Sequence, residues 1–295
     1  MNLINRLNNS ADVLLSDGAT GTFLQERGLE PGGGPELMNI DSPEAVMEMA
    51  EGYFTSGSDF VLTNSFGGSP FMLKKYGYEE ETEKFNREAA KLAKIHCPED
   101  GFVVGSIGPT GEFLEPLGSV TVDQMSQGFM KQISGLLEGG VDGIIFETQM
   151  AIEELKLGIS VAKNMTDLPV IGSMVFDKGP RGFFTMMGVS PEKACFEIKE
   201  SGADVVATNC GNGSKVMAEL AKELLIYTEL PLMIQSNAGI PKIKGGKVIY
   251  DESPDFMGKN YELLVEMGVD VIGGCCGTNF DHIKKFRKII NTAKI

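Results

Sequence analysis

The sequence has no block of basic residues, no long apolar run and only two histidines among its 295 residues. Its 26 Lys and Arg are outnumbered by 41 Asp and Glu, so the formal net charge is −15 and a nucleic-acid backbone would be repelled. The N-terminus lacks the apolar core of a signal peptide, and no run approaches the roughly 18 apolar residues of a membrane helix. We therefore expect a cytoplasmic protein that contacts neither membrane nor nucleic acid.

Nucleotide-binding signatures and domain linkers are also missing. The sequence has neither a dinucleotide-binding Gly-x-Gly-x-x-Gly motif nor a phosphate-binding Gly-Lys-Ser/Thr motif, so a nucleotide cofactor is not implied. With 42% hydrophobic and 23% charged residues, the composition is that of a soluble globular protein. Because no low-complexity segment divides the chain, residues 1–295 are predicted to form one domain.

A weak internal repeat indicates the architecture. A Gly-X-Asp sequence leads into apolar residues four times, at 57–62, 140–145, 202–206 and 268–272. The pattern is typical of a helix that ends at glycine, a polar turn and a parallel strand buried on both faces. Asp142, Asp204 and Asp270 are 62 and 66 residues apart, twice the length that one strand and helix need, so a further strand is predicted between each pair.

The intervening strands bring the predicted number to eight. Strands are expected at 13–16, 60–62, 102–106, 143–145, 169–175, 205–209, 231–235 and 269–272. Amphipathic stretches of helix length separate them, at 43–56, 79–95, 122–138, 151–164, 191–201, 214–227, 254–267 and 280–291. This alternation predicts an α/β fold with a closed parallel sheet, a (β/α)8 TIM barrel. An open doubly wound sheet is the alternative, but it gives no reason for the even spacing.

Active sites of such barrels lie at the carboxyl ends of the strands. Polar and unusual residues concentrate just past the predicted strand ends, at 17–22, 63–67, 108–112, 147–149, 210, 237–239 and 275–276. The loosest stretches of the chain, 32–35 and 244–247, fall in long connections at the same face. The loops 28–36 and 240–250 that contain them are therefore interpreted as lying at the barrel mouth.

Three cysteines follow apolar strands in this set. Cys275 and Cys276 come after the strand 269–272, and Cys210 follows the strand 205–209, so a barrel would bring the three thiols together. Three thiolates suit zinc and leave a fourth tetrahedral position open. Such a site would polarise a carbonyl poorly, but it would hold a substrate thiol as thiolate at neutral pH.

Other interpretations of the cysteines and histidines remain open. Cys275 and Cys276 could form a redox pair, although a disulfide between neighbours needs a strained ring, or could simply pack. Cys97 and Cys195 lie in or beside predicted helices and are expected to be packing residues. The two histidines, His96 and His282, are likewise interpreted as surface or packing residues.

The mouth also offers groups suited to an amino acid. Asp17 and Glu147, at the ends of the first and fourth strands, could meet an ammonium group. The glycine-rich turn 18–22 could expose backbone N–H groups to a carboxylate. Alternatively, Asp17 belongs to a simple turn and Glu147 is a carboxylate favoured by a helix N-terminus.

Several of these segments together resemble the homocysteine S-methyltransferase family. The segments that carry the resemblance are 17–22, 63–67, 108–111, 147–148, 209–210 and 273–278. Within the family, 64–67, 108–112 and 237–239 are most similar to the homocysteine-binding domain of cobalamin-dependent methionine synthase. The match spans almost the whole chain, and the double cysteine with its upstream Asn-Cys is its most specific part.

The resemblance implies a (β/α)8 homocysteine-binding domain that transfers a methyl group to homocysteine and gives methionine. It implies that zinc is bound by Cys210, Cys275 and Cys276, and that the amino acid is held by Asp17, Gly18, Ala19, Thr20, Asn64 and Glu147. Long synthases of this kind carry folate and cobalamin modules after the barrel, whereas this sequence ends at Ile295. A methylcorrinoid on a separate protein docking at the mouth is therefore the expected donor.

Departures from the family pattern at 179–184 and 211–213 leave alternatives for donor and acceptor. One is a small-molecule donor, a betaine or a sulfonium, with the same zinc and thiolate chemistry, or a different acceptor thiol. The other is a non-enzymatic subunit that binds zinc or a thiol.

Overall fold

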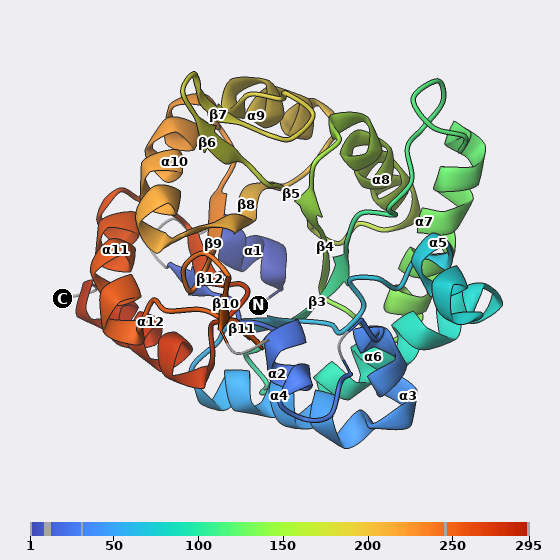
Figure 1. Cartoon of the computed structure of the whole chain (residues 1–295), viewed down its shortest axis with the longest axis horizontal. Helices are drawn as coiled ribbons and strands as arrows, with labels where there is room; N and C mark the ends of the chain where they lie inside the picture. Colours follow the sequence, from blue (N-terminus) through green and yellow to red (C-terminus); the bar gives the residue numbers. More distant parts are fainter. Residues whose placement is uncertain (1, 9–12, 31, 245–246, 294–295) are drawn as a thin grey trace.

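The protein is described by a computed structural model that covers residues 2–8, 13–30, 32–244 and 247–293. Eight parallel strands surround a central axis and alternate with helices that form an outer ring (Figure 1). The strands are β1 (Leu14–Leu15), β2 (Phe60–Leu62), β3 (Phe102–Ile107), β4 (Gly143–Gln149), β5 (Val170–Met174), β8 (Val205–Gly213), β9 (Leu232–Asn237) and β12 (Val271–Gly274). Hydrogen-bonded neighbours run in the order β1-β12-β9-β8-β5-β4-β3-β2, so the predicted TIM barrel is confirmed.

One helix follows each barrel strand in the outer ring, as predicted. These helices are α4 (Pro43–Thr55), α6 (Thr82–Ile95), α7 (Val122–Glu138), α8 (Ile152–Met165), α9 (Pro191–Glu200), α10 (Ser214–Tyr227), α11 (Pro254–Glu266) and α12 (Phe280–Ala293). Local sequence fixes several starts: Thr121 and Gln124 form a reciprocal capping box at α7. Ser190 and Ser253 cap α9 and α11, each followed by proline at the first helical position.

The Gly-X-Asp repeat has a structural explanation that the sequence did not disclose. Each repeat aspartate accepts a hydrogen bond from the backbone N–H at the start of the preceding barrel strand. The pairs are Asp59 with Leu15 (2.8 Å), Asp142 with Val103 (2.7 Å), Asp204 with Val170 (2.8 Å) and Asp270 with Leu232 (2.8 Å). The repeat glycines have positive φ, from 86° to 109°, a conformation at helix ends that favours glycine.

The apolar core has an inner and an outer part. Inside the barrel, side chains such as Phe60, Phe102 and Met233 pack together, and Leu3 and Leu7 of the short helix α1 (Leu3–Leu7) join them. Helix α1, which the sequence did not predict, thus contributes to the inner core. The larger outer part lies between the strands and the ring of helices.

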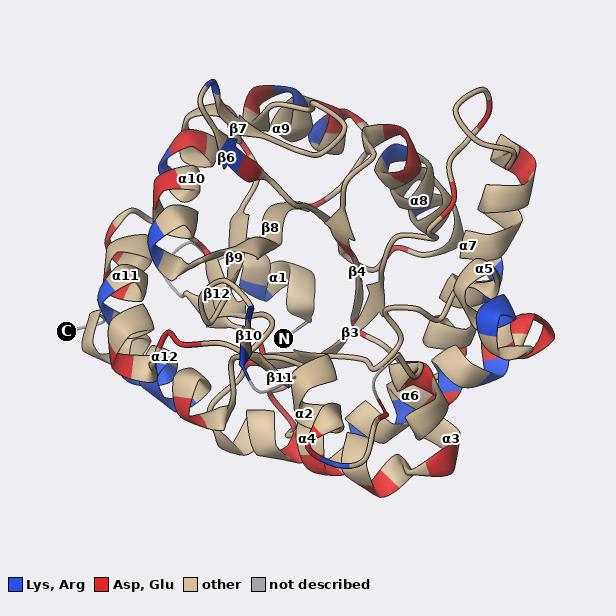
Figure 2. Cartoon of the chain, in the orientation of Figure 1, with Lys and Arg blue, Asp and Glu red and all other residues tan. Residues whose placement is uncertain are grey.

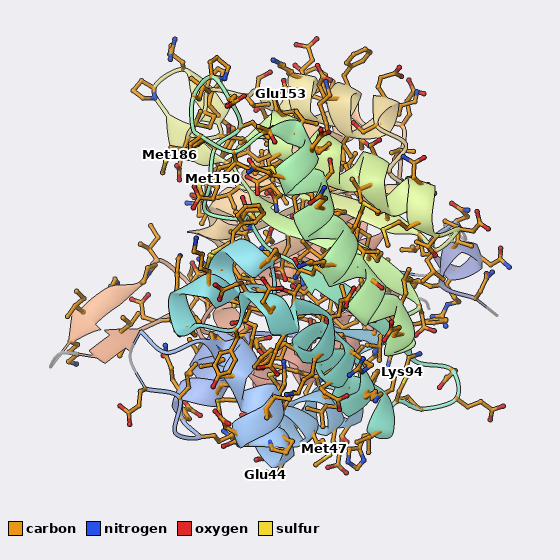
Figure 3. The ribbon with its side chains drawn as sticks, turned by 90° about the vertical axis from the view of Figure 1, so that its right-hand side faces the viewer. Glu44, Met47, Lys94, Met150, Glu153 and Met186 are labelled. Atoms are coloured by element: carbon orange, nitrogen blue, oxygen red, sulfur yellow. The ribbon has the colours of Figure 1, made fainter. Side chains whose placement is uncertain are left out.

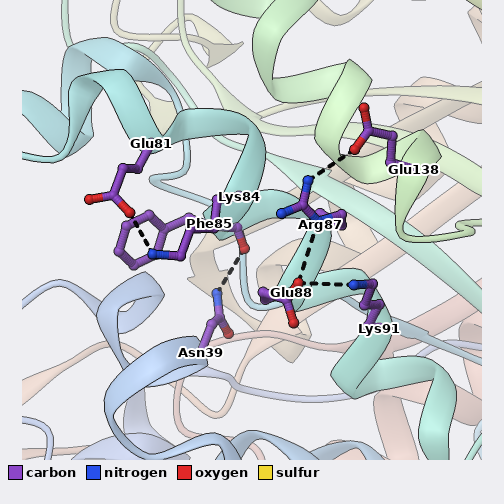
Figure 4. A network of polar contacts seen from close by, with 8 residues as sticks. All are labelled: Asn39, Glu81, Lys84, Phe85, Arg87, Glu88, Lys91 and Glu138. Atoms are coloured by element: carbon purple, nitrogen blue, oxygen red, sulfur yellow. Dashed lines mark hydrogen bonds and ion pairs between the residues drawn. The ribbon is translucent and has the colours of Figure 1, made fainter.

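Charged residues lie mainly on the outer ring (Figure 2). Figure 4 shows one network on α6, where Arg87 pairs with Glu138 of α7 at 3.0 Å and with Glu88 at 3.4 Å. Asn39, from α3 (Met38–Asp41), donates to the Phe85 carbonyl at 3.4 Å. The Arg87 ion pairs lie at the surface, where solvent screens them, so they join neighbouring helices without dominating stability.

The connections at the carboxyl ends of the strands carry extra short elements. They are α2 (Gly21–Gln25), α5 (Pro70–Leu73), the 3-10 turns η1 (Pro35–Leu37), η2 (Lys74–Tyr76) and η3 (Glu79–Glu81), and the hairpins β6 (Asp177–Gly179) with β7 (Gly182–Phe184) and β10 (Lys242–Lys244) with β11 (Lys247–Ile249). In Figure 3, Met150 and Met186 lie on the side where β10 and β11 protrude, and Lys94 lies toward the other. The loop predicted at 240–250 is thus largely a hairpin; Pro31, Gly245 and Gly246 lie outside the described residues.

No helix in the described ranges is both long and apolar enough to cross a membrane.

Candidate metal centre and substrate pocket

The inside of the barrel changes from apolar to polar toward the carboxyl ends of the strands. Polar residues stand two positions after inner-core residues on six strands, so the twofold periodicity of a strand puts them on the same inner face. The pairs are Leu14 and Ser16, Val104 and Ser106, Ile145 and Glu147, Ile171 and Ser173, Ala207 and Asn209, and Met233 and Gln235. Side-chain hydrogen bonds join several of these polar residues across strands, so they form a floor beneath the mouth.

The structure brings Cys210, Cys275 and Cys276 together, as the sequence predicts. Cys210 lies in the last part of β8, and the other two follow β12. Their sulfur atoms all lie within 4.8 Å of one another, and none is in a disulfide. Cys210 has a φ of 62°, unusual for a residue with a side chain, at an irregularity of the β8–β9 pairing.

The chemistry of this sulfur cluster fits a metal ion. Four tetrahedral ligands at a zinc–sulfur distance of about 2.3 Å place sulfurs about 3.8 Å apart, within the observed limit. Hydrogen bonds from the Cys275 and Cys276 thiols to the Cys210 sulfur hold the pKa of Cys210 far below its ordinary value, whereas the pKa of each donor thiol is raised. Only a cation would let all three ionise together.

Asn237 is a neighbour of the cluster that the sequence analysis did not select as a site residue. Its side-chain amide lies near the Cys210 sulfur and helps to lower the pKa of that thiol. Its Oδ1 is buried without a hydrogen-bond partner in the described part of the protein. A buried amide oxygen of this kind is suited to a cation or to a polar ligand beside the sulfurs.

Two carboxyl groups, the buried Asp17 and the partly buried Glu147, lie near each other and near the cysteines. Burial raises the pKa of Glu147 to about 7, opposed by a hydrogen bond from Ser106, and the charge of Cys210 raises it further. Burial raises the pKa of Asp17 to about 8; the Leu62 N–H lowers it and the charge of Glu147 adds to the rise. Each carboxylate would therefore gain from a cationic ligand.

Asp17 has a free acceptor. It is 1% exposed, and its Oδ2 accepts the Leu62 N–H at 2.7 Å. Its Oδ1 is buried and has no hydrogen-bond partner among the described residues. An orphaned carboxylate oxygen below the mouth is suited to a donor supplied by a ligand.

Asp17 should make the metal-free protein less stable as the pH rises. At low pH the carboxyl is protonated whether the chain is folded or not. From about pH 4 to pH 8 the unfolded chain loses this proton while the folded chain keeps it, so the free energy of unfolding falls. Between pH 5 and pH 8 we expect the wild type to lose roughly 3–4 kcal/mol of unfolding free energy relative to Asp17→Asn. Urea unfolding at both pH values measures this, and parallel changes in the two proteins would contradict it.

The turn after β1 is fixed by its neighbours. The Ala19 N–H donates to Thr278 Oγ1 at 3.2 Å, and the Ala19 carbonyl accepts from the Tyr53 hydroxyl at 2.7 Å. The Ala19 N–H is therefore not available to a ligand. Gly18 has no room for a side chain, because an added Cβ would lie 2.8 Å from Thr278 Oγ1 and 2.9 Å from the Tyr53 ring.

Asn64 has a structural role that the sequence did not indicate. Its Nδ2 donates to the Pro35 carbonyl at 2.8 Å and to Asn39 Oδ1 at 3.0 Å. Its backbone carbonyl accepts from Asn39 Nδ2 at 2.8 Å. These bonds tie the loop after β2 to the loop at 32–35, so a ligand would meet an Asn64 whose amide donors are already engaged.

One cavity of about 520 Å³ connects these groups. It reaches the three cysteines, Glu147, Asn64 and the turn at 18–21. Its outer wall contains Glu36, Phe66, Met72 and Tyr76. Gly32, Gly33 and Pro35 also line it, so the loop predicted at 28–36 does border the mouth. Asp17, which is almost fully buried, is not among the residues that line the cavity.

The other cysteines and histidines lie outside this cavity. Cys195 is buried in α9, and burial raises the pKa of its thiol to about 12. Cys97 follows α6 and is partly exposed. His282 packs in α12, where its Nε2 contacts the Glu252 carbonyl at 3.0 Å, and His96 is at the end of α6. These placements agree with packing and surface roles.

Known proteins are similar to this chain along most of its length. The family model described as homocysteine S-methyltransferase matches residues 14–290. Methionine synthase of Mycobacterium leprae is 27% identical over 293 residues, and that of Mycobacterium tuberculosis is 27% identical over 305 residues. The alignments cover 92% and 97% of this chain but 24% and 25% of the synthases, so the chain spans about a quarter of their length.

Solved structures confirm the fold. The homocysteine methyltransferase MmuM of Escherichia coli is 19% identical, and its oxidized form has a TM-score of 0.81, covering 98% of this chain and 99% of that one. Its metallated form has a TM-score of 0.78 and covers 94% and 96%. The family model extends from the first barrel strand to the last helix, and the chain therefore belongs to the homocysteine S-methyltransferase family, a family of methyltransferases.

Proposed function

We propose that residues 1–295 are the homocysteine-binding barrel domain of a zinc-dependent homocysteine S-methyltransferase, and that a separate methylcorrinoid protein delivers the methyl group. The observation that carries this proposal is the meeting of three cysteine sulfurs within 4.8 Å at the mouth of a barrel, in a cavity that Glu147 also lines. Membership of the family supports homocysteine as the acceptor.

The three cysteines would hold zinc and leave one position for the substrate sulfur. Bound zinc would lower the pKa of the substrate thiol and keep it as thiolate at neutral pH, where a free thiol of pKa ~8.5 is mostly protonated. Three thiolates make a weak Lewis acid, which suits activation of a sulfur better than hydrolysis of a carbonyl.

Asp17 and Glu147 would bind the ammonium group of homocysteine. Asp17 is buried, Glu147 is partly buried, and both have raised pKa values, so a positive charge between them would relieve the cost of their ionisation. Gly18 and Thr20 would contribute the backbone of the turn to the substrate carboxylate. Asn64 would hold the opposite wall in place through its bonds to Pro35 and Asn39.

Methyl transfer then needs alignment more than acid–base help. The substrate sulfur forms a bond to the methyl carbon as the bond from that carbon to the donor breaks, and the electron pair stays on the donor. The thiol proton would already have passed to solvent when the thiolate formed, so the product, methionine, would be a neutral thioether that binds a metal poorly. The chain contributes by holding sulfur and ammonium in one orientation.

The identity of the donor is the finer part of the proposal. The likeness to methionine synthases along their homocysteine-binding part supports a corrinoid. A betaine or sulfonium is the second candidate, because Phe66, Tyr76 and the carboxyl group of Glu36 line the outer cavity, and aromatic faces with an anion attract small organic cations.

A donor panel tests the proposal. The purified, zinc-loaded protein would be incubated with homocysteine and methylcobalamin, a betaine or S-methylmethionine, and methionine would be measured. We expect methionine from the corrinoid and none from the small donors. Turnover with a small donor would favour the second candidate, and a folded protein that binds neither zinc nor homocysteine would contradict the whole proposal.

A further inference from the structure

The Asn209 side chain lies at the centre of the polar floor. It is 0% exposed. Its Oδ1 accepts the Thr148 N–H at 2.8 Å and the Ser173 hydroxyl at 2.7 Å. Its Nδ2 donates to Thr148 Oγ1 at 2.7 Å and to Glu147 Oε2 at 3.3 Å. The amide oxygen thus accepts two hydrogen bonds, and the NH2 group, which has two hydrogens, has two close oxygen acceptors.

These partners determine which way the amide points. The Thr148 N–H can only donate, so the atom facing it must be the amide oxygen. The NH2 group therefore faces the Glu147 carboxylate, and it also makes a long contact of 3.9 Å with the Cys275 sulfur. One NH2 group thus touches both a carboxylate proposed to bind the ammonium and a sulfur proposed to bind the metal.

Asn209 also connects two unusual backbone positions. Thr148 and Cys210 are the only non-glycine residues with positive φ among those the structure describes, at 59° and 62°. Such conformations are strained for residues with a side chain and persist where neighbouring groups enforce them. Asn209 precedes Cys210 directly and binds both the N–H and the hydroxyl of Thr148, so it is placed to enforce both.

We propose that Asn209 is a positioning residue that holds Glu147 and Cys275 in one fixed relation, so that the ammonium and the sulfur of the substrate are bound together. This inference rests on the proposed function. Asn209 touches no substrate atom itself. It acts by directing a carboxylate oxygen and by sharing an N–H of the same NH2 group with a thiolate, as outer-shell groups do around metal ligands.

Cobalt(II) is the probe for the test, because its thiolate complexes absorb light. Asn209→Ser is expected to weaken Co2+ binding by about 10–100-fold in competition with a chelator. The sulfur-to-cobalt charge-transfer band should move to lower energy, because the Cys275 thiolate loses an N–H donor. If Asn209→Ser does not fold, Asn209→Asp takes its place in the test. This variant keeps the shape of the side chain and both acceptor contacts but loses the N–H donors, so it should show the same change in spectrum.

Ser173→Ala is the matched control. It removes one bond to the same amide but none of the contacts from the NH2 group, so it should lower the melting temperature and leave the cobalt spectrum and affinity unchanged. If both Asn209 variants bind Co2+ with the wild-type affinity and spectrum, the positioning role is wrong. If the folded wild type itself binds no Co2+, the proposed function fails instead, so the two failures are distinguishable.

Discussion

Cys210→Ala is expected to lose the metal ion and to lower methyl transfer by more than 100-fold. Loss of an outer-shell partner costs about 10–100-fold in metal affinity or activity, and a directly coordinating thiolate should cost more. The two sulfurs left, Cys275 and Cys276, are adjacent in sequence and cannot surround the ion. Metal content of the purified protein, together with methionine formation, measures both effects.

Cys195→Ala is the control for removing a thiol. Cys195 is 2% exposed in α9, and its sulfur lies 4.0 Å from the Leu224 carbonyl, away from the mouth. Its loss should cost about 1 kcal/mol of stability and leave one metal ion per chain. Equal metal content in wild type and Cys210→Ala would mean that Cys210 is not a ligand.

Glu147→Gln should raise the KM for homocysteine by about 30-fold at pH 8, with unchanged metal content. Removing one partner of a buried charge pair costs about 2 kcal/mol or more, and 1.4 kcal/mol is tenfold in affinity. The pKa of Glu147 is raised to about 7 by burial, so the carboxylate is mostly ionised at pH 8 and most of the charge is available to the ammonium.

An analogue without the amino group, 4-mercaptobutanoate, shows whether this contact is the cause. The wild type should bind the analogue more weakly than homocysteine, whereas Glu147→Gln should distinguish the two thiols less strongly, because only the Asp17 carboxyl is then left to meet the ammonium. This is a double-mutant cycle between protein and ligand. If the variant distinguishes the two thiols as strongly as the wild type does, Glu147 does not bind the ammonium.

Much of the barrel could be predicted because its rules are local. The helix predicted at 122–138 begins and ends where α7 does, since the capping residues and the glycine at its end are neighbours in sequence. The prediction at 79–95 divides into η3 and α6, a boundary that periodicity does not specify. Helix α1 and the two hairpins were missed, because short elements are decided by what they pack against.

The site was predictable by position but not by contact. The cysteines were found because each follows a strand, and the barrel brings strand ends together. Asn209 was noticed only as part of the Asn-Cys motif, although it stands two residues after the inner-core Ala207 and could have been assigned to the floor. Asn64 illustrates the opposite case, since nothing local predicts that its amide is engaged by Pro35 and Asn39.

The sequence by itself determined the eightfold alternation of strands and helices and the residues that stand at each strand end, because periodicity and turn signals act within a few residues. Only the tertiary structure decided how those strand ends combine. The pairing of Asn209 with Glu147 and Cys275 joins residues 62 and 66 positions away in the chain. The burial that raises the pKa of Asp17 likewise depends on residues far from it in the chain. Closure of the barrel creates both, since it removes water from groups that the unfolded chain leaves apart and solvated.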